Sequence, residues 1–182
     1  MPEYKFVRQD FTDPEEVERT IAGMPEWAKS LTAFLYLFGC RVSEALLLTP
    51  EHFKITKAKI MVTIPILKKR DTSGPYQNVH TLSVSRKAPF AELVVEWVEK
   101  HQADPKQRLW RRTRVRTWQV IKEANRNLSP HVFRHDRLSK LAMAEAPDVV
   151  LMRWAGWSDT RPAARYIHLR PEGLSKFADK IR

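Results

Sequence analysis

Two runs of strand-forming residues lie close together in a chain whose other segments have helical patterns, and this arrangement restricts the fold most. Lys59–Leu67 and Gln77–Val84 are rich in β-branched residues, and the polar segment Lys68–Pro75 between them has the composition of a turn. Residues 53–56 can add a short third strand. Because strands joined by a short turn pair antiparallel, the pattern predicts one small antiparallel sheet near residues 53–84.

Helical segments account for the rest of the chain, and most of its 12 prolines fall between them. The capping-box pattern Thr12–Glu15 predicts that Thr12 is the N-cap of a helix that ends near Ala22, and Gly39 is expected to end the next helix. The 182 residues suit a single domain of the α+β class, mostly α. Further helices are expected near residues 25–38, 43–48, 89–101, 113–126, 130–144, 147–154, 160–167 and 171–180.

The charge balance points to a polyanionic partner. The chain has 32 Lys and Arg against 21 Asp and Glu, a formal net charge of +11 with neutral histidines. This surplus favours nucleic acid, with an anionic membrane surface as the second candidate. No apolar run approaches the roughly 18 residues of a membrane span, so we expect no membrane segment. The single cysteine, Cys40, excludes an intrachain disulfide and a cysteine-based zinc site, and it is compatible with a reducing cytosol.

Positive charge is most concentrated between Lys106 and Arg116, a segment without acidic residues in which Trp110 interrupts the basic side chains. In the helix that follows, we expect Trp118, Ile121 and Ala124 to pack inward and the basic residues to stay outside. Such residues form either a solvated helix face or a surface that neutralises DNA phosphates. The candidate DNA-binding residues are Lys106, Arg108, Arg111, Arg112, Arg114, Arg116, Lys122 and Arg126.

A second cluster is His131-Val-Phe-Arg134-His135. His131 and Arg134 are three positions apart in a predicted helix, so they share a face and can reach the same small target. His131 and His135 have the spacing of helical zinc ligands, but Val132 stands where a zinc protease of that type has glutamate. We therefore expect no metal here.

Arg41 and Tyr166 need partners to be chemically useful. Arg41 lies between apolar segments, so we expect a partly buried guanidinium paired with Glu44. A tyrosine such as Tyr166 is commonly a packing residue. Its phenol has a pKa near 10, so it is a poor nucleophile on its own. It becomes a nucleophile where cations stabilise negative charge and a base is near.

Together these elements resemble the catalytic domain of the tyrosine recombinases, the phage-integrase family. Gly39-Cys-Arg41-Val-Ser-Glu44-Ala-Leu is similar to the family's first arginine box, G-x-R-x-S-E-L. Lys68 follows at the predicted hairpin tip, where the family's catalytic lysine lies, and His131–His135 resembles its H-x-L-R-H box. Ala155-Gly-Trp157-Ser-Asp159, with Tyr166 nine residues after Trp157, resembles its L-G-H-S…Y box. The resemblance covers about residues 14–170.

The resemblance implies site-specific recombination or integration by cleavage and rejoining of DNA through a 3′-phosphotyrosyl bond, without metal or cofactor. Tyr166 would attack the phosphodiester, while Arg41 and Arg134 would stabilise the extra charge. His131 would transfer protons, and Lys68 would protonate the leaving 5′ oxygen. Glu44 would have a supporting role as the partner of Arg41. Lys69 would have one because it is adjacent to Lys68, and the geometry of the turn determines which of the two lysines reaches the leaving oxygen. Trp157 offers one N–H donor and no acid–base capacity.

The chain departs from the family pattern in three ways. Trp157 replaces the usual histidine, and Asp136-Arg137 replaces the usual Thr/Ser-Phe. Residues 1–182 contain no N-terminal core-binding domain, so we expect one catalytic domain, with 171–182 as a C-terminal segment exchanged between neighbours. The implied partner is double-stranded DNA, on which the protein would assemble as a tetramer.

Two alternatives stay open. A type IB topoisomerase uses a similar Arg, Lys and Tyr set but has lysine where this chain has His131. A non-catalytic DNA-binding module is a third interpretation, although Tyr166 and both arginines are present. By the same resemblance, we expect the protein in the cytoplasm of a prokaryote or of the host cell of a virus or mobile element, associated with the nucleoid.

Overall fold

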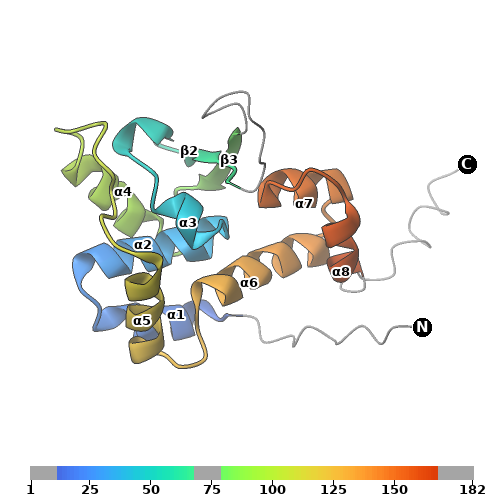
Figure 1. The fold of residues 1–182 in the computed structure, drawn as a ribbon, viewed down its shortest axis with the longest axis horizontal. Helices are drawn as coiled ribbons and strands as arrows, with labels where there is room; N and C mark the ends of the chain where they lie inside the picture. The colour runs from blue at the N-terminus through green and yellow to red at the C-terminus, as the bar shows by residue number, and fades with distance from the viewer. Residues whose placement is uncertain (1–11, 68–78, 168–182) are drawn as a thin grey trace, which may run out of the picture.

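The computed structural model describes residues 12–67 and 79–167, which form helices around one buried helix with a small sheet on one side (Figure 1). The buried helix is α2 (Glu26–Phe38), in which ten of 13 residues are buried. It is surrounded by α1 (Pro14–Ala22), α4 (Ala91–Lys100), α5 (Arg114–Ala124) and α6 (Pro130–Met143). The aromatic rings of Phe34, Phe38 and Trp110 meet in this core. The predicted mostly α fold of the α+β class is confirmed.

The sheet has three antiparallel strands in the order β1 (Phe53–Ile55), β2 (Lys59–Pro65) and β3 (Val79–Ser85). Ile60, Val62 and Ile64 of β2 alternate with more exposed residues and turn one face of the sheet into the core. In the second ladder, Val62 lies opposite Leu82. The predicted sheet is therefore confirmed, and the predicted turn between β2 and β3 lies outside the described residues.

The first helix begins one residue later than the capping-box pattern predicts. Asp13 is the N-cap of α1, because its carboxylate accepts a hydrogen bond from the backbone N–H of Glu15 at 3.0 Å. Thr12 is buried, and its backbone N–H donates to the carboxylate of Asp136 at 2.9 Å. Asp136 also forms an ion pair with Lys140 at 2.9 Å. The buried carboxylate thus holds the start of α1 against α6, and the prediction of Thr12 as N-cap is wrong.

Helix α5 turns a different face inward from the one predicted. Thr117, Val120 and Ile121 are buried, whereas the Trp118 side chain is 50% exposed. Ala124 is exposed as well. The predicted burial is confirmed for Ile121 and wrong for Trp118 and Ala124. The reason is that α5 packs against α1, α2 and α3 with the side that carries residues 117–121, which the sequence pattern does not show. Trp110, in contrast, is buried and donates from its indole to Ser30 Oγ at 2.9 Å.

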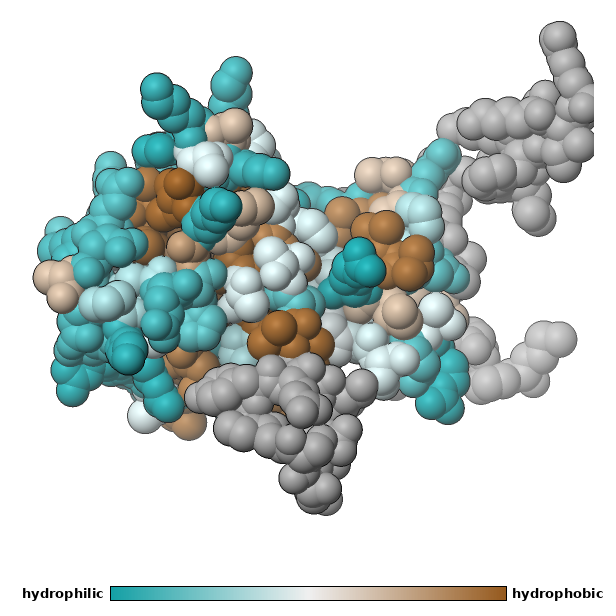
Figure 2. Space-filling view, turned by 90° about the horizontal axis from the view of Figure 1, so that it is seen from above, coloured by the Kyte–Doolittle hydropathy of each residue, from teal (hydrophilic) through white to brown (hydrophobic). Residues whose placement is uncertain are grey.

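The C-terminal helices form a second, smaller apolar cluster. The helices α7 (Asp148–Ala155) and α8 (Ala164–Ile167) pack on the far half of α6, and the 3₁₀ turn η2 (Arg161–Ala163) precedes α8. The cluster contains Leu138, Ala142, Leu151, Ala155, Ala163 and Tyr166. Apolar side chains are also exposed on the surface at the end of the molecule formed by α7 and α8 (Figure 2). The predicted helix 171–180 lies outside the described residues. No helix in the described part of the chain is long and apolar enough to cross a membrane.

Candidate active site

The first arginine box forms the turn between α2 and the short helix α3 (Val42–Ala45), which is followed by the 3₁₀ turn η1 (Pro50–His52). Gly39 ends α2 in the left-handed conformation with φ 59°, and a Cβ there would lie 2.7 Å from the Cβ of Arg137. Glycine is therefore required both by the backbone angle and by the neighbouring helix α6.

Glu44 holds Arg41 in place. Glu44 is 1% exposed, and its Oε1 accepts a hydrogen bond from Arg41 Nη1 at 2.7 Å. Its other oxygen accepts the backbone N–H of Arg41 at 2.9 Å, which caps α3. The side chain of Arg41 keeps 27% of its surface exposed. Arg41 is thus partly exposed while paired with Glu44, and the predicted pair of Arg41 with Glu44 is confirmed.

Arg134 is fixed by backbone carbonyl groups instead of a carboxylate. Its Nη1 donates to the carbonyl of Gly39 at 3.1 Å, and its Nη2 donates to the carbonyl of Ala155 at 2.7 Å. The residue is 7% exposed. Burial and then the charge of Arg41 lower the pKa of Arg134 below its ordinary value. Among the described residues no acidic side chain forms an ion pair with Arg134, so its positive charge is available to an anion.

Tyr166 reaches this site from α8 and is 3% exposed. Its hydroxyl lies 2.8 Å from Nδ1 of His135. Its ring stacks on that of Trp157, with centroids 6.2 Å apart and an interplanar angle of 28°. Burial raises the pKa of Tyr166, although the charges of Arg134 and Arg165 act in the opposite direction. The phenol is thus a neutral, oriented hydroxyl that needs a base in order to become a nucleophile.

Trp157 lies between the tyrosine and the second arginine. Gly156 ends α7 in the left-handed conformation with φ 62°, which lets the chain turn before Trp157. The guanidinium of Arg134 lies 5.9 Å from the centre of the Trp157 ring, a cation–π distance. None of the described residues accepts a hydrogen bond from the indole N–H. Within residues 12–67 and 79–167, the indole N–H of Trp157 is therefore an unpaired donor beside Arg134 and Tyr166.

His135 is a site residue that sequence reasoning missed. Its Nε2 lies 2.9 Å from Nε2 of His131, and its Nδ1 faces Tyr166. The sequence signal for His135 is its position in the H-x-x-R-H box, one turn after His131, a spacing that is also typical of two zinc ligands on a helix. Among the described residues no group of three or more metal-ligating side chains forms.

His80 of β3 is a second residue without a sequence signal. Its Nδ1 lies 2.9 Å from the carbonyl of Arg153, which ties the sheet to α7. Arg137 is a third, and it donates to the carbonyl of Tyr36 at 3.3 Å while its guanidinium lies 5.8 Å from the centre of the Trp154 ring. The Asp136-Arg137 pair that departs from the family pattern thus joins α6 to the start of α1 and to α2.

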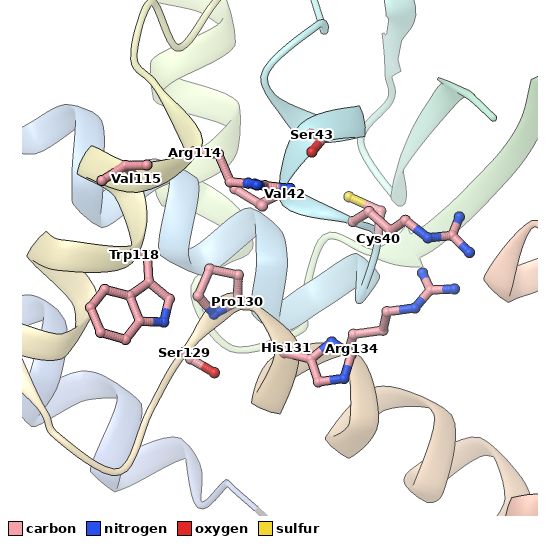
Figure 3. A pocket seen from close by; sticks show the side chains of 11 residues that line it. Cys40, Val42, Ser43, Arg114, Val115, Trp118, Ser129, Pro130, His131 and Arg134 are labelled. Atoms are coloured by element: carbon pink, nitrogen blue, oxygen red, sulfur yellow. The ribbon is translucent and has the colours of Figure 1, made fainter. Parts of the chain in front are cut away.

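A pocket of about 420 Å³ connects the two arginines with α5. In Figure 3, His131 and Arg134 project from α6 toward the segment of Cys40, while Trp118 and Arg114 line the opposite side. Of the predicted basic residues, Lys106, Arg108, Arg111, Arg112, Arg114, Arg116 and Arg126 are exposed and Lys122 is half-buried. Only Arg114 of these lines the pocket, together with the exposed Trp118 that was expected to be buried. Lys68 and Lys69 lie outside the described residues.

The fold and this arrangement of arginines, histidines and tyrosine define the class as a tyrosine recombinase catalytic domain. The chain belongs to the phage integrase family, which matches residues 10–172. A search of curated proteins finds no match.

Solved structures of similar fold agree with this family. The catalytic domain of bacteriophage HP1 integrase is 21% identical, with a TM-score of 0.63 and 94% coverage of each chain. The XerH site-specific recombinase bound to its difH substrate is 15% identical with a TM-score of 0.67, and the Tn1549 transposon integrase in complex with transposon right end DNA is 15% identical with a TM-score of 0.60. The match to XerH covers 94% of this chain and 52% of that one, and the match to the Tn1549 integrase covers 98% and 66%. The chain thus spans about half the length of XerH.

Proposed function

We propose that this chain is the catalytic domain of a site-specific recombinase or integrase that cleaves and rejoins DNA through Tyr166. The observation that carries the proposal is the grouping around Trp157, whose ring lies 6.2 Å from that of Tyr166 and 5.9 Å from the guanidinium of Arg134. A nucleophile and a buried cation that has no carboxylate partner in the described part of the chain therefore share one site. This arrangement suits attack on a phosphodiester, whose transition state gains negative charge.

In the proposed reaction the oxygen of Tyr166 bonds to phosphorus and the 5′ oxygen departs, which leaves a 3′-phosphotyrosyl bond. Arg41 and Arg134 donate hydrogen bonds to the non-bridging oxygens. Glu44 keeps Arg41 oriented through its 2.7 Å ion pair. His131 takes part in proton transfer, and Lys68, or its neighbour Lys69, protonates the leaving oxygen. The reaction returns along the same path when a 5′ hydroxyl attacks the phosphotyrosine.

The proposal extends to partners. Double-stranded DNA is the proposed substrate. In support, XerH was solved bound to its difH substrate and the Tn1549 integrase in complex with transposon right end DNA. Recombination joins two sites, so we propose a tetramer on DNA in which residues 171–182 are exchanged between neighbours. A protein with this substrate acts in the cytoplasm of its host cell, at the nucleoid.

The proposal is tested with a pool of random-sequence duplexes that carry a nick in one strand. Cleavage close to the nick releases a short 5′-hydroxyl fragment, which diffuses away and traps the covalent adduct. We expect a protein–DNA adduct that survives denaturation and whose sequenced DNA defines the site. Strand exchange between two such sites separates a recombinase from a topoisomerase, and a protein that binds the pool without forming an adduct would be a DNA-binding module.

DNA affinity is expected to fall steeply with salt, because the basic residues of segment 106–126 are exposed except for the half-buried Lys122. If about six phosphates are contacted, log K against log salt has a slope of about −5. Reversal of charge at Arg114 and Arg116 should weaken binding more than reversal at Arg19, a basic residue of α1 that is also exposed. Fluorescence anisotropy over a salt series measures both effects, and a flat response to salt would contradict the proposed DNA-binding surface.

Two substitutions of Trp157 distinguish between its possible roles as a hydrogen-bond donor to the phosphate and as a packing residue. We expect Trp157→Phe to lower the cleavage rate about 10²–10³-fold, as for loss of one transition-state donor, and Trp157→His to retain most of it. Imidazole supplies an N–H that phenylalanine lacks. The rates are compared at equal folded fraction. The opposite order, with phenylalanine tolerated and histidine damaging, would show that Trp157 acts only by packing on Tyr166.

A further inference from the structure

Three side chains of the site form a continuous hydrogen-bonded chain. The hydroxyl of Tyr166 lies 2.8 Å from Nδ1 of His135, and Nε2 of His135 lies 2.9 Å from Nε2 of His131. His135 is half-buried, while His131 is exposed. His131 also lines the pocket that contains Arg134, as Figure 3 shows. The chain thus runs from the buried phenol through one imidazole to a second imidazole at the surface.

The hydrogen positions follow from this network. Within the described part of the chain, His135 is the acceptor within reach of the Tyr166 hydroxyl, so the hydroxyl donates to Nδ1. A neutral imidazole that accepts at Nδ1 carries its hydrogen at Nε2. His135 therefore donates from Nε2 to His131, whose own hydrogen then lies on Nδ1. That N–H is free to donate toward a phosphate oxygen in the pocket.

We propose that His135 is the general base that takes the proton of Tyr166, and that His131 receives this proton at second hand. The inference rests on the proposed function. As the Tyr166 oxygen bonds to phosphorus, the bond from phosphorus to the 5′ oxygen breaks and the phenolic proton moves to Nδ1 of His135. The imidazolium then passes its Nε2 proton to His131, which releases it to solvent. The departing 5′ oxygen takes its proton from the general acid of the proposed function, Lys68 or Lys69.

The charges around His135 favour this role. On its own helix it faces His131 and Arg134, and from α8 it faces Tyr166 and Arg165. Burial and then the charges of His131, Arg134 and Arg165 lower the pKa of His135 below its ordinary value. His135 is consequently neutral at pH 7, the form that accepts a proton. Tyr166, whose pKa burial raises, stays protonated at the same pH and gains most from a base in contact.

The first test needs no DNA. In the free protein labelled with ¹⁵N histidine, NMR is expected to show His135 with an unprotonated Nδ1 and a protonated Nε2 at pH 7. Tyr166→Phe removes the donor to Nδ1 and should shift that nitrogen's resonance, whereas Tyr36→Phe, at a buried tyrosine of α2, should not. A hydrogen on Nδ1 of His135 in the free protein would overturn the proposal, whatever the activity.

The second test is the rate of adduct formation by His135→Asn. The Oδ1 of asparagine can lie where Nδ1 lies and can accept the same hydrogen bond, but it cannot take up a proton. We expect a loss of about 10²–10⁴-fold at pH 7. The wild-type rate should fall only below the pKa of His135 and level off above it, while the variant's rate should rise about tenfold per pH unit because hydroxide must deprotonate Tyr166. A variant with wild-type rate and pH profile would reduce His135 to a positioning residue.

A substrate with a different leaving group distinguishes loss of the general base, His135, from loss of the general acid. If sulfur replaces the bridging 5′ oxygen, the leaving thiolate needs no proton. Of Lys68→Ala and Lys69→Ala, the variant that is slow on the ordinary substrate should then regain most of its activity, whereas His135→Asn should stay slow. Recovery of His135→Asn on the sulfur substrate would show that His135 acts on the leaving group, which contradicts the proposal. An adduct that Tyr166→Phe abolishes but His135→Asn leaves unchanged would overturn this inference while the proposed function stands.

Discussion

Tyr166→Phe is expected to abolish the covalent protein–DNA adduct, to below about one thousandth of the wild-type rate, because it removes the attacking oxygen. DNA affinity should stay close to that of the wild type, since the ring and its stacking on Trp157 remain. The free energy of unfolding should fall by only about 1 kcal/mol, the contribution of one hydrogen bond to His135. Adduct yield on denaturing gels and anisotropy on intact duplex measure the two properties separately.

Tyr36→Phe is the matched control, because Tyr36 is also buried but lies in α2. It should form the adduct at the wild-type rate. If Tyr166→Phe still formed an adduct, another residue would be the nucleophile, and the assignment of Tyr166 would be wrong.

Arg134→Lys is expected to lower the cleavage rate about 10³–10⁵-fold, the range seen when an arginine that stabilises phosphoryl transfer is lost. A single ammonium cannot replace the two nitrogens that now donate to the carbonyl groups of Gly39 and Ala155. One buried carbonyl loses its partner, so the free energy of unfolding should also fall by about 1–3 kcal/mol. Single-turnover cleavage at equal folded fraction, with chemical denaturation alongside, measures both.

Arg137→Lys controls for the loss of a half-buried arginine in the same helix. Arg137 donates to the carbonyl of Tyr36, and its guanidinium lies over the ring of Trp154. We expect a similar loss of stability from it but a far smaller loss of cleavage rate. Equal loss of rate in both variants would mean that Arg134 acts through the packing of α6 and does not act on the phosphate.

Local chemistry made one part of the site predictable from sequence. Gly39 ends a helix, and Arg41 and Glu44 are three residues apart, so their pairing follows from short-range geometry. Arg134 and Tyr166 were predicted as site residues only through the resemblance to the family, because the residues they contact lie far away in the sequence. The sheet followed from two runs of strand-forming residues and the turn between them.

The contacts that sequence reasoning missed depend on how elements pack. Trp118 has the spacing of a core residue, but α5 lies on its 117–121 face and leaves the indole at the pocket. Asp136 takes the backbone N–H of Thr12 from 124 residues away, which displaces the N-cap to Asp13. His135 meets Tyr166 only because α8 folds back onto α6. Contacts between residues so far apart in the sequence cannot be predicted from local sequence patterns.

The two carbonyl groups that hold Arg134 have a consequence for the balance between stability and activity. A buried guanidinium that forms no ion pair with a carboxylate among residues 12–67 and 79–167 keeps an electrostatic cost in the folded protein, which the rest of the core must offset. A bound phosphate relieves that cost, because it supplies the missing countercharge without first displacing a resident anion. By the proposed function, the charge that lowers the stability of the free domain would also strengthen binding of the substrate phosphate. A variant selected for stability at this position would then lose affinity for the substrate.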